Sequence, residues 1–170
     1  NISLEWLIRS GGRVQNLLTK GSLNHLTYQI KQAPKDYFKS VIKAVNEADN
    51  KGIETNIYLE DWSNGMKNSK DFVFEYLDIL NELPVKRILL PDTLGILSPD
   101  ETFKYVSLVT KKYPKMHFDF HAHNDYDLSV SNVIESLKAG CHGIHLTVNG
   151  MGERAGNAPM ASAAAVIRDF

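Results

Sequence analysis

The sequence predicts an α/β fold, and more narrowly a fragment of a (βα)8 TIM barrel. Short apolar runs alternate along the 170 residues with longer amphipathic segments, which is the pattern of βα units around a parallel sheet. The apolar runs begin at intervals of about 30 residues, as expected for repeated βα units. Within several runs, polar and apolar side chains alternate, which favours a barrel with a polar interior over a sheet buried on both faces.

Five strands and their helices can be placed in order. The predicted strands cover residues 13–19, 53–59, 85–91, 116–122 and 142–148, and the main predicted helices cover 34–52, 69–83, 98–113, 126–139 and 158–170. A surface helix is expected within 22–32, and 60–68 is expected to be a loop.

Residues that start and stop helices support these boundaries. Pro34 suits a first helical turn and Gly52 a C-terminal cap, while Pro84 ends the following helix. Ser98 and Glu101 form a capping-box pattern, in which each side chain satisfies an early backbone N–H group. The helix at 69–83 has apolar side chains at helical spacing, namely Phe72, Val73, Tyr76, Leu77 and Leu80.

The alternation of faces is clearest in the fourth strand. One face carries His117, Asp119, His121 and His123, and the other carries Phe118, Phe120 and Ala122. The same split recurs over 56–60 and over 144–149. Because a complete barrel needs about 250 residues and eight strands, we expect residues 1–170 to be one partial catalytic barrel domain. It should cover about strands 3 to 7, with the first strands and any C-terminal regulatory domain outside it.

The composition excludes several classes of partner. With a net charge of −1 and scattered basic residues, the chain lacks the basic stripe of a nucleic-acid reader, and no apolar run is long enough to span a bilayer. The N-terminus has neither an initiator Met nor a secretory signal pattern. A single cysteine, Cys141, excludes an internal disulfide, so we expect a reducing, cytoplasmic location.

The strongest chemical signal is His121-Ala122-His123. Two imidazoles at i and i+2 on a strand project side by side and can bind one divalent metal. Such a pair can also be two polar residues at a strand end, but Asn124-Asp125 follows it directly. This places the pair at the carboxyl end of a barrel strand, where barrels build their active sites. His25 has no such context and is expected to be structural.

Three further segments carry polar groups at strand ends. The glycine-rich stretch 151–157 suits either a ligand-binding loop or an ordinary turn, although its Glu, Arg and Asn favour the former. Glu60 could be an acid or base, or a solvated loop carboxylate. Thr93 could bind a substrate carboxylate or cap a turn. Polar groups at consecutive strand ends together favour a functional site.

These motifs as a set resemble those of a known family. The set comprises His121–Asp125 (HAHND), Gly150–Asn157 (GMGERAGN), Tyr58–Gly65 (YLEDWSNG) and Leu90–Gly95 (LPDTLG). It is similar to the catalytic domain of the 2-isopropylmalate, citramalate and homocitrate synthases. The GERAGN loop distinguishes these synthases from related barrel lyases and aldolases, which share only the H-x-H.

The resemblance implies roles for individual residues. His121 and His123 match two metal-binding histidines, and Asn157 matches an asparagine at or near the metal, which could be Mg, Mn or Zn. Glu60 matches a glutamate near the acetyl-CoA methyl group, and Thr93 a threonine that binds the 2-oxoacid carboxylate. The family's first strand supplies an arginine and an acidic metal ligand that nothing before Asn16 can match. The segment alone should therefore hold metal poorly and catalyse nothing.

The implied activity is a metal-dependent Claisen condensation of acetyl-CoA with a small 2-oxoacid, by a homodimer. Leu18 and Tyr58 should point into the oxoacid pocket, and their bulk favours pyruvate and a citramalate synthase in branched-chain amino-acid biosynthesis. The alternatives are a 2-isopropylmalate synthase using 2-oxoisovalerate in leucine biosynthesis and a non-catalytic metal-binding or assembly fragment. A lyase is a further alternative, but such relatives usually place a cysteine in the loop that here spans Gly150 to Asn157.

Overall fold

Five parallel strands form one sheet in the computed structural model, which describes residues 2–169. They are β1 (Val14–Lys20), β2 (Glu54–Glu60), β3 (Val85–Asp92), β4 (Phe118–Ala122) and β5 (Gly143–His145). They lie side by side in chain order, and every neighbouring pair is parallel. A doubly wound sheet reverses its strand order at a switch point, whereas consecutive order is that of a barrel. The predicted barrel fragment is therefore confirmed.

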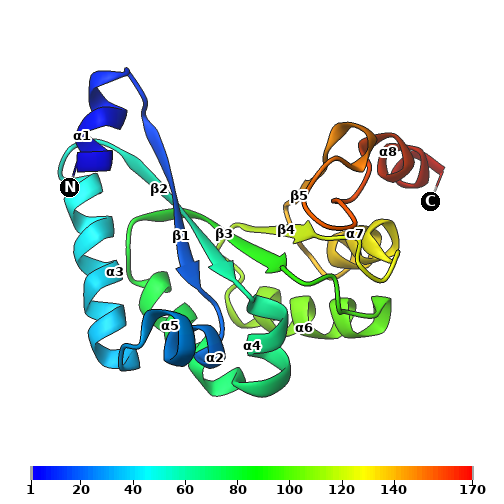
Figure 1. Ribbon diagram of the computed structural model, residues 1–170, viewed down its shortest axis with the longest axis horizontal. Coiled ribbons are helices and arrows are strands. Elements are labelled where there is room, and N and C mark those ends of the chain that lie inside the picture. Colours follow the sequence, from blue (N-terminus) through cyan, green and yellow to red (C-terminus); the bar gives the residue numbers. More distant parts are fainter. Residues whose placement is uncertain (1, 170) are drawn as a thin grey trace.

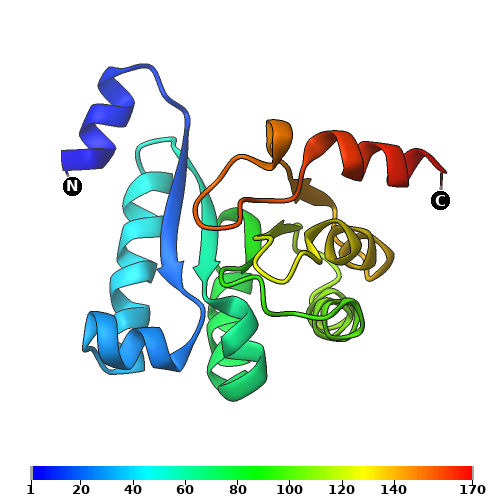
Figure 2. The same cartoon turned by 45° about the vertical axis from the view of Figure 1, so that its right-hand side comes forward.

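Helices connect the strands, and several of them cover one side of the sheet (Figure 1). They are α1 (Ile2–Arg9), α2 (Leu23–His25), the π-helical η1 (Leu26–Ile30), α3 (Pro34–Asp49), α4 (Trp62–Asn68), α5 (Lys70–Asn81), α6 (Pro99–Lys112), α7 (Ser129–Lys138), the 3-10 turn η2 (Val148–Gly150) and α8 (Met160–Asp169). Figure 1 shows α3, α5 and α6 along the same side of the strands. In the turned view of Figure 2, α1 and α8 extend away from the sheet at opposite ends.

The core lies between the sheet and these helices, as the alternation of side chains predicts. Ile57 and Leu59 of β2 and Phe118 and Phe120 of β4 are fully buried in it. All five apolar residues predicted for the face of α5 are buried there too. Full burial of one such side chain stabilises the fold by about 1.5–3 kcal/mol. Tyr58 and Glu60 of β2 and His121 of β4 therefore lie on the opposite, barrel-interior face.

The expectation of a loop over 60–68 is wrong, because residues 62–68 form α4. Asn64 and Gly65 are weak helix formers, so the local sequence hides this helix. Packing stabilises it instead, since Trp62 and Met66 are almost completely buried. A Cβ at Gly65 would lie only 2.0 Å from the carbonyl oxygen of Gly21, so glycine is required where α4 approaches the loop after β1.

The segment after β1 also differs from the expected surface helix. It forms the short α2 and then one π-helical turn. The side chain of His25 is only 16% exposed and lies 3.5 Å from the carboxylate of Asp61, so His25 is not a surface residue. Helix α1 was not expected from the sequence either.

The last two βα units are shorter than predicted. β5 ends at His145 rather than at 148, because Thr147 bridges to Pro159 and Asn149 takes a left-handed conformation with φ 56°. Val148, the last apolar residue of the predicted strand, is 58% exposed, so the buried face of this strand ends before it. Helix α7 begins at Ser129 rather than at 126, after Asp127 turns the chain with φ 56°. Residue 170, the predicted end of the last helix, lies outside the described residues.

Among residues 2–169, no helix combines the length and the apolar character that crossing a bilayer requires.

Cys141 is expected to be an unreactive thiol in the native protein. It is 8% exposed, and burial, assisted by the nearby Asp119 carboxylate, raises its pKa to about 12. Because the unfolded thiol ionises near pH 8.5, its contribution to stability is lost as the pH rises above that value, by at most about 1.4 kcal/mol per pH unit. Mass spectrometry of the Cys141 peptide after alkylation at pH 8 should show labelling only when urea is present. Rapid labelling of the native protein would contradict this prediction.

Candidate active site

A cavity of about 280 Å³ opens at the carboxyl ends of strands β1 to β4. It is lined by Leu18, Tyr58, Glu60, Pro91, Thr93, His121, His123 and Glu153. Six of the seven site residues predicted from the sequence therefore meet in one place. The seventh, Asn157, pairs through its backbone with His123.

The two histidines present their Nε2 atoms to each other at the end of β4. The Nε2 atoms of His121 and His123 lie 3.4 Å apart, and the rings are nearly perpendicular, at 84°. A tetrahedral ion with nitrogen ligands about 2.0–2.1 Å away separates them by roughly 3.3–3.4 Å. The pair is therefore already spaced for one metal ion.

The surroundings of the pair also fit a metal. The Oδ1 atom of Asn157, whose backbone pairs with His123, is buried without a hydrogen-bond partner, and such a group needs an explanation in a folded protein. Burial, followed by the neighbouring His123 and His145, lowers the pKa of His121 to about 4. His121 is thus neutral near pH 7, as a metal ligand must be.

The ligand set within residues 2–169 is incomplete. No group of three or more His, Cys, Asp or Glu side chains in this part of the chain is arranged to hold an ion. Glu153 comes nearest, with Oε1 3.8 Å from His123 Nε2, but its side chain is 66% exposed. The expectation that His121, His123 and Asn157 bind a metal together with ligands from outside this segment stays a prediction.

The glycine-rich loop folds directly onto the end of β4. The amide of Asn124 donates to the carbonyl of Gly156, and the Asn157 side chain donates to the Met151 carbonyl at 2.9 Å. A Cβ at Gly152 would lie 2.3 Å from Nδ2 of Asn157. The glycine therefore makes room for Asn157 beside the histidines.

Arg154 joins three strand-end segments. Its guanidinium donates to both carboxylate oxygens of Asp125, at 2.7 and 2.9 Å, and to the carbonyl of Thr93 at 2.7 Å. The bond from Arg154 lowers the pKa of Asp125. The arginine of the GERAGN loop thus holds the loop containing Thr93 against the one that follows the histidines.

Glu60 is paired with a lysine that the sequence argument did not single out. Lys20 and Glu60 are register partners at the ends of β1 and β2, and Lys20 Nζ bonds to Oε2 of Glu60. Their side chains are 14% and 25% exposed. Because Lys20 lies two positions after Leu18 in β1, the alternation of side chains that places Leu18 on the interior face also places Lys20 there.

Thr93 is oriented by the backbone next to Glu60. The amide of Asp61 donates to Thr93 Oγ1 at 2.8 Å. This bond orients the Thr93 hydroxyl, which retains its own proton to donate to a ligand in the cavity.

Leu18 and Tyr58 form the apolar wall, and they too are register partners. Leu18 is 63% exposed on the concave face. The Tyr58 ring contacts the ring of His145 on β5, with ring centroids 5.8 Å apart. This contact holds the Tyr58 ring in position.

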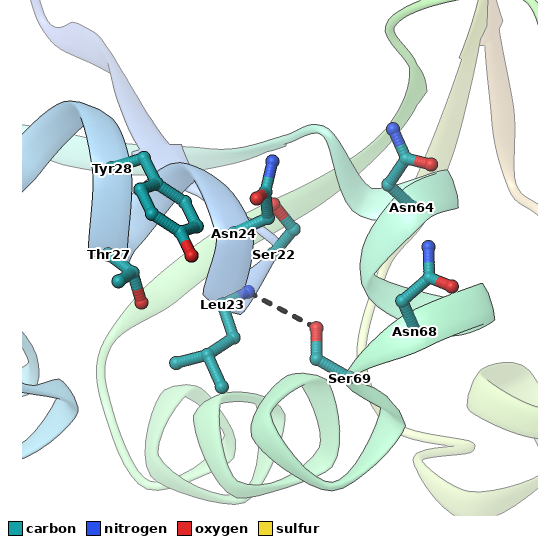
Figure 3. A pocket seen from close by; sticks show the side chains of 8 residues that line it. All are labelled: Ser22, Leu23, Asn24, Thr27, Tyr28, Asn64, Asn68 and Ser69. Carbon is teal, nitrogen blue, oxygen red and sulfur yellow. Dashed lines mark hydrogen bonds between the residues drawn. The ribbon is translucent and has the colours of Figure 1, made fainter.

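A second cavity, of about 370 Å³, lies between α2 and η1 on one side and helix α4 on the other. Figure 3 shows its neutral lining of amides, hydroxyls and one leucine, contributed by Ser22, Leu23, Asn24, Thr27, Tyr28, Asn64, Asn68 and Ser69. Ser69 Oγ accepts a bond from the Leu23 amide across it. Its walls carry no charged side chain, so we place the chemistry in the cavity at the histidines.

Comparison with known proteins agrees with this geometry. The family model described as HMGL-like matches residues 12–169. The chain belongs to the HMGL-like family. It is similar to the homocitrate synthase of Saccharolobus islandicus (strain L.S.2.15 / Lassen #1), with 33% identity over 144 residues, covering 85% of this chain and 31% of that protein. It is also similar to the homocitrate synthase of Sulfolobus acidocaldarius, with 31% identity over 130 residues, covering 76% of this chain and 27% of that protein.

Two solved structures with low sequence identity have the same fold. A Bacillus subtilis HMG-CoA lyase superposes with a TM-score of 0.86 at 17% identity, covering 99% of this chain and 60% of the lyase. An Acinetobacter baumannii HMG-CoA lyase, in complex with coenzyme A and 3-methylmalate, gives 0.78 at 18% identity, covering 98% of this chain and 57% of that one.

The chain thus spans about a third of the length of the homocitrate synthases it matches. The broader family resemblance is confirmed, while the narrower expectation of a citramalate synthase stays a prediction.

Proposed function

We propose that this chain is part of an enzyme that condenses acetyl-CoA with a 2-oxoacid in a Claisen reaction. The observation that carries the proposal is the cavity that joins Glu60, Thr93 and the His121–His123 pair. The similarity to homocitrate synthases supports a synthase. The absence of cysteine from residues 150–157 argues against the lyase alternative.

Within this proposal, His121, His123 and Asn157 would hold a divalent ion together with ligands from outside this segment. The chemistry that such an ion would supply there is polarisation of the ketone of the oxoacid. The Thr93 hydroxyl donates its proton to the oxoacid carboxylate, and the Asp61 amide orients this hydroxyl by donating to Thr93 Oγ1.

Glu60 removes the proton from the acetyl methyl group. Lys20 bonds to Oε2 of Glu60 and thereby fixes the carboxylate, while Oε1 accepts the proton. The methyl carbon then forms a bond to the ketone carbon, whose oxygen takes up the electron pair. Water hydrolyses the thioester and releases free CoA, which makes the reaction irreversible.

The part of the lining that residues 2–169 supply favours an oxoacid with a small side chain. The bulk of Leu18 and Tyr58 favours pyruvate over 2-oxoisovalerate.

The test is CoA release by the full-length protein with a divalent metal and each of three oxoacids. Fastest release with pyruvate supports a citramalate synthase. Fastest release with 2-oxoisovalerate or 2-oxoglutarate would assign a 2-isopropylmalate or a homocitrate synthase and overturn the argument from Leu18 and Tyr58.

Replacing Tyr58 with alanine is expected to admit the branched oxoacid. Because even one extra methylene in an apolar pocket changes selectivity by about 1–3 kcal/mol, the kcat/KM ratio of 2-oxoisovalerate to pyruvate should rise by at least that factor, roughly 10- to 200-fold. Tyr105→Ala, on helix α6 away from the cavity, is the matched control and should leave the ratio unchanged. An unchanged ratio in the Tyr58 variant would remove Tyr58 from the pocket wall.

A further inference from the structure

Asp61 directly follows Glu60 and takes an uncommon backbone conformation. Its φ and ψ are 66° and 25°, in the left-handed region, which residues other than glycine, Asn and Asp rarely adopt. This one residue turns the chain from the end of β2 into helix α4. The turn holds Glu60 at the last position of the strand, facing the cavity.

The Asp61 side chain is fully buried and ties two segments together. Its carboxylate accepts bonds from Ser22 Oγ at 2.6 Å and from Asn64 Nδ2 at 2.7 Å. His25 Nε2 lies 3.5 Å from the same carboxylate. Ser22 and Asn64 come from the facing elements of Figure 3, the loop after β1 and helix α4.

The Asp61 backbone controls Thr93. Its amide donates to Thr93 Oγ1 at 2.8 Å, which occupies one of the two acceptor sites of that hydroxyl. The Glu60 carbonyl, on the other side of the same peptide unit, accepts the Gly21 amide. The unit between Glu60 and Asp61 is therefore held from both sides.

We propose that Asp61 is a positioning residue for two groups at once, the Glu60 carboxylate and the Thr93 hydroxyl. This inference rests on the proposed function, because the proposed function is what gives Thr93 a substrate carboxylate to bind. Asp61 itself touches no substrate. Its buried carboxylate holds the left-handed turn, and the turn aims its amide at Thr93.

Three substitutions separate the side chain from the backbone. Asp61→Asn keeps the shape and tolerates the left-handed turn, and the Ser22 hydroxyl can rotate to accept from the new amide. Asp61→Gly keeps the turn accessible but loses every side-chain bond. Ser22→Ala removes one bond to the carboxylate without altering the turn residue, and serves if the glycine variant fails to fold.

The experiment measures pyruvate binding to the full-length protein in the presence of Mn²⁺ and without acetyl-CoA. Asp61→Gly should raise the Kd for pyruvate about tenfold, and Ser22→Ala should raise it less, as expected for the loss of hydrogen bonds that hold a donor. Asp61→Asn should leave the Kd for pyruvate close to that of the unaltered protein. Asp127→Gly is the matched control, because Asp127 is exposed and has a similar φ of 56°, and it should not change the Kd.

A double-mutant cycle with Thr93→Val tests whether Asp61 affects pyruvate binding through Thr93. If Asp61 acts through Thr93, Asp61→Gly has no further effect on pyruvate binding once Thr93 is valine. An equal effect in both backgrounds, or no measurable pyruvate binding in the unaltered protein, overturns the proposal. CoA release is measured separately and tests the proposed function. If pyruvate binding depends on Asp61 but no CoA is released, the proposed condensation is refuted and the positioning role of Asp61 stands.

Discussion

Replacing Glu60 with glutamine in the full-length protein is expected to lower kcat for CoA release by about 10²- to 10⁴-fold, the usual contribution of a general base. Glutamine has nearly the same shape but cannot accept the methyl proton. The bond to Lys20 can persist through the amide oxygen, so KM for the oxoacid should change little. Steady-state kinetics with pyruvate and acetyl-CoA measure both quantities.

Glu54→Gln is the matched control for this substitution. Glu54 begins the strand that Glu60 ends, and it pairs with Lys86, with both side chains more than half exposed. It should leave kcat unchanged. If Glu60→Gln has normal turnover, Glu60 is not the base, and its pairing with Lys20 is structural.

Substitution of either histidine of the pair is expected to weaken metal binding strongly. Loss of a group that only supports a ligand already weakens binding by about 10- to 100-fold, so His121→Gln and His123→Gln should each exceed that loss. Calorimetric titration of the full-length protein with Mn²⁺ measures the affinity. Activity should fall in parallel at limiting metal and recover in part at high metal.

His117→Gln provides the control for this measurement. His117 directly precedes β4, on the face that carries His121, but its Nε2 bonds to Asp119 at 2.8 Å, and it does not line the cavity. Its replacement should leave the metal affinity within error. A metal affinity that survives both His121→Gln and His123→Gln would place the metal elsewhere.

The barrel face of the strands could be predicted from the sequence because strand periodicity is a local property. Polar His121 and buried Phe120 alternate along one strand, and no knowledge of the neighbouring strands is needed to read this. The same rule placed Tyr58 and Glu60 correctly. Identification of the cavity then needed only the expectation that strand ends meet at one edge of the sheet.

The contacts that organise the site depend on packing between distant segments. Arg154 reaches the Thr93 carbonyl across 61 positions and Asp125 across 29, and no local pattern specifies such partners. Helix α4 was missed for the same reason, because burial of Trp62 and the close approach of Gly65 to Gly21 outweigh its weak helix propensity. The π-helical turn η1 and the left-handed Asp61 likewise have no sequence signature of their own.

The most direct test of the account is release of free CoA from acetyl-CoA by the full-length protein, with a divalent metal and pyruvate, followed by mass spectrometry of the product. If the proposed condensation is correct, CoA release requires both the metal and the oxoacid, and the product is the oxoacid with the two acetyl carbons added. Carbon–carbon cleavage of a 3-hydroxyacyl-CoA without any condensation would assign the chain to the lyase branch of the family and contradict the account.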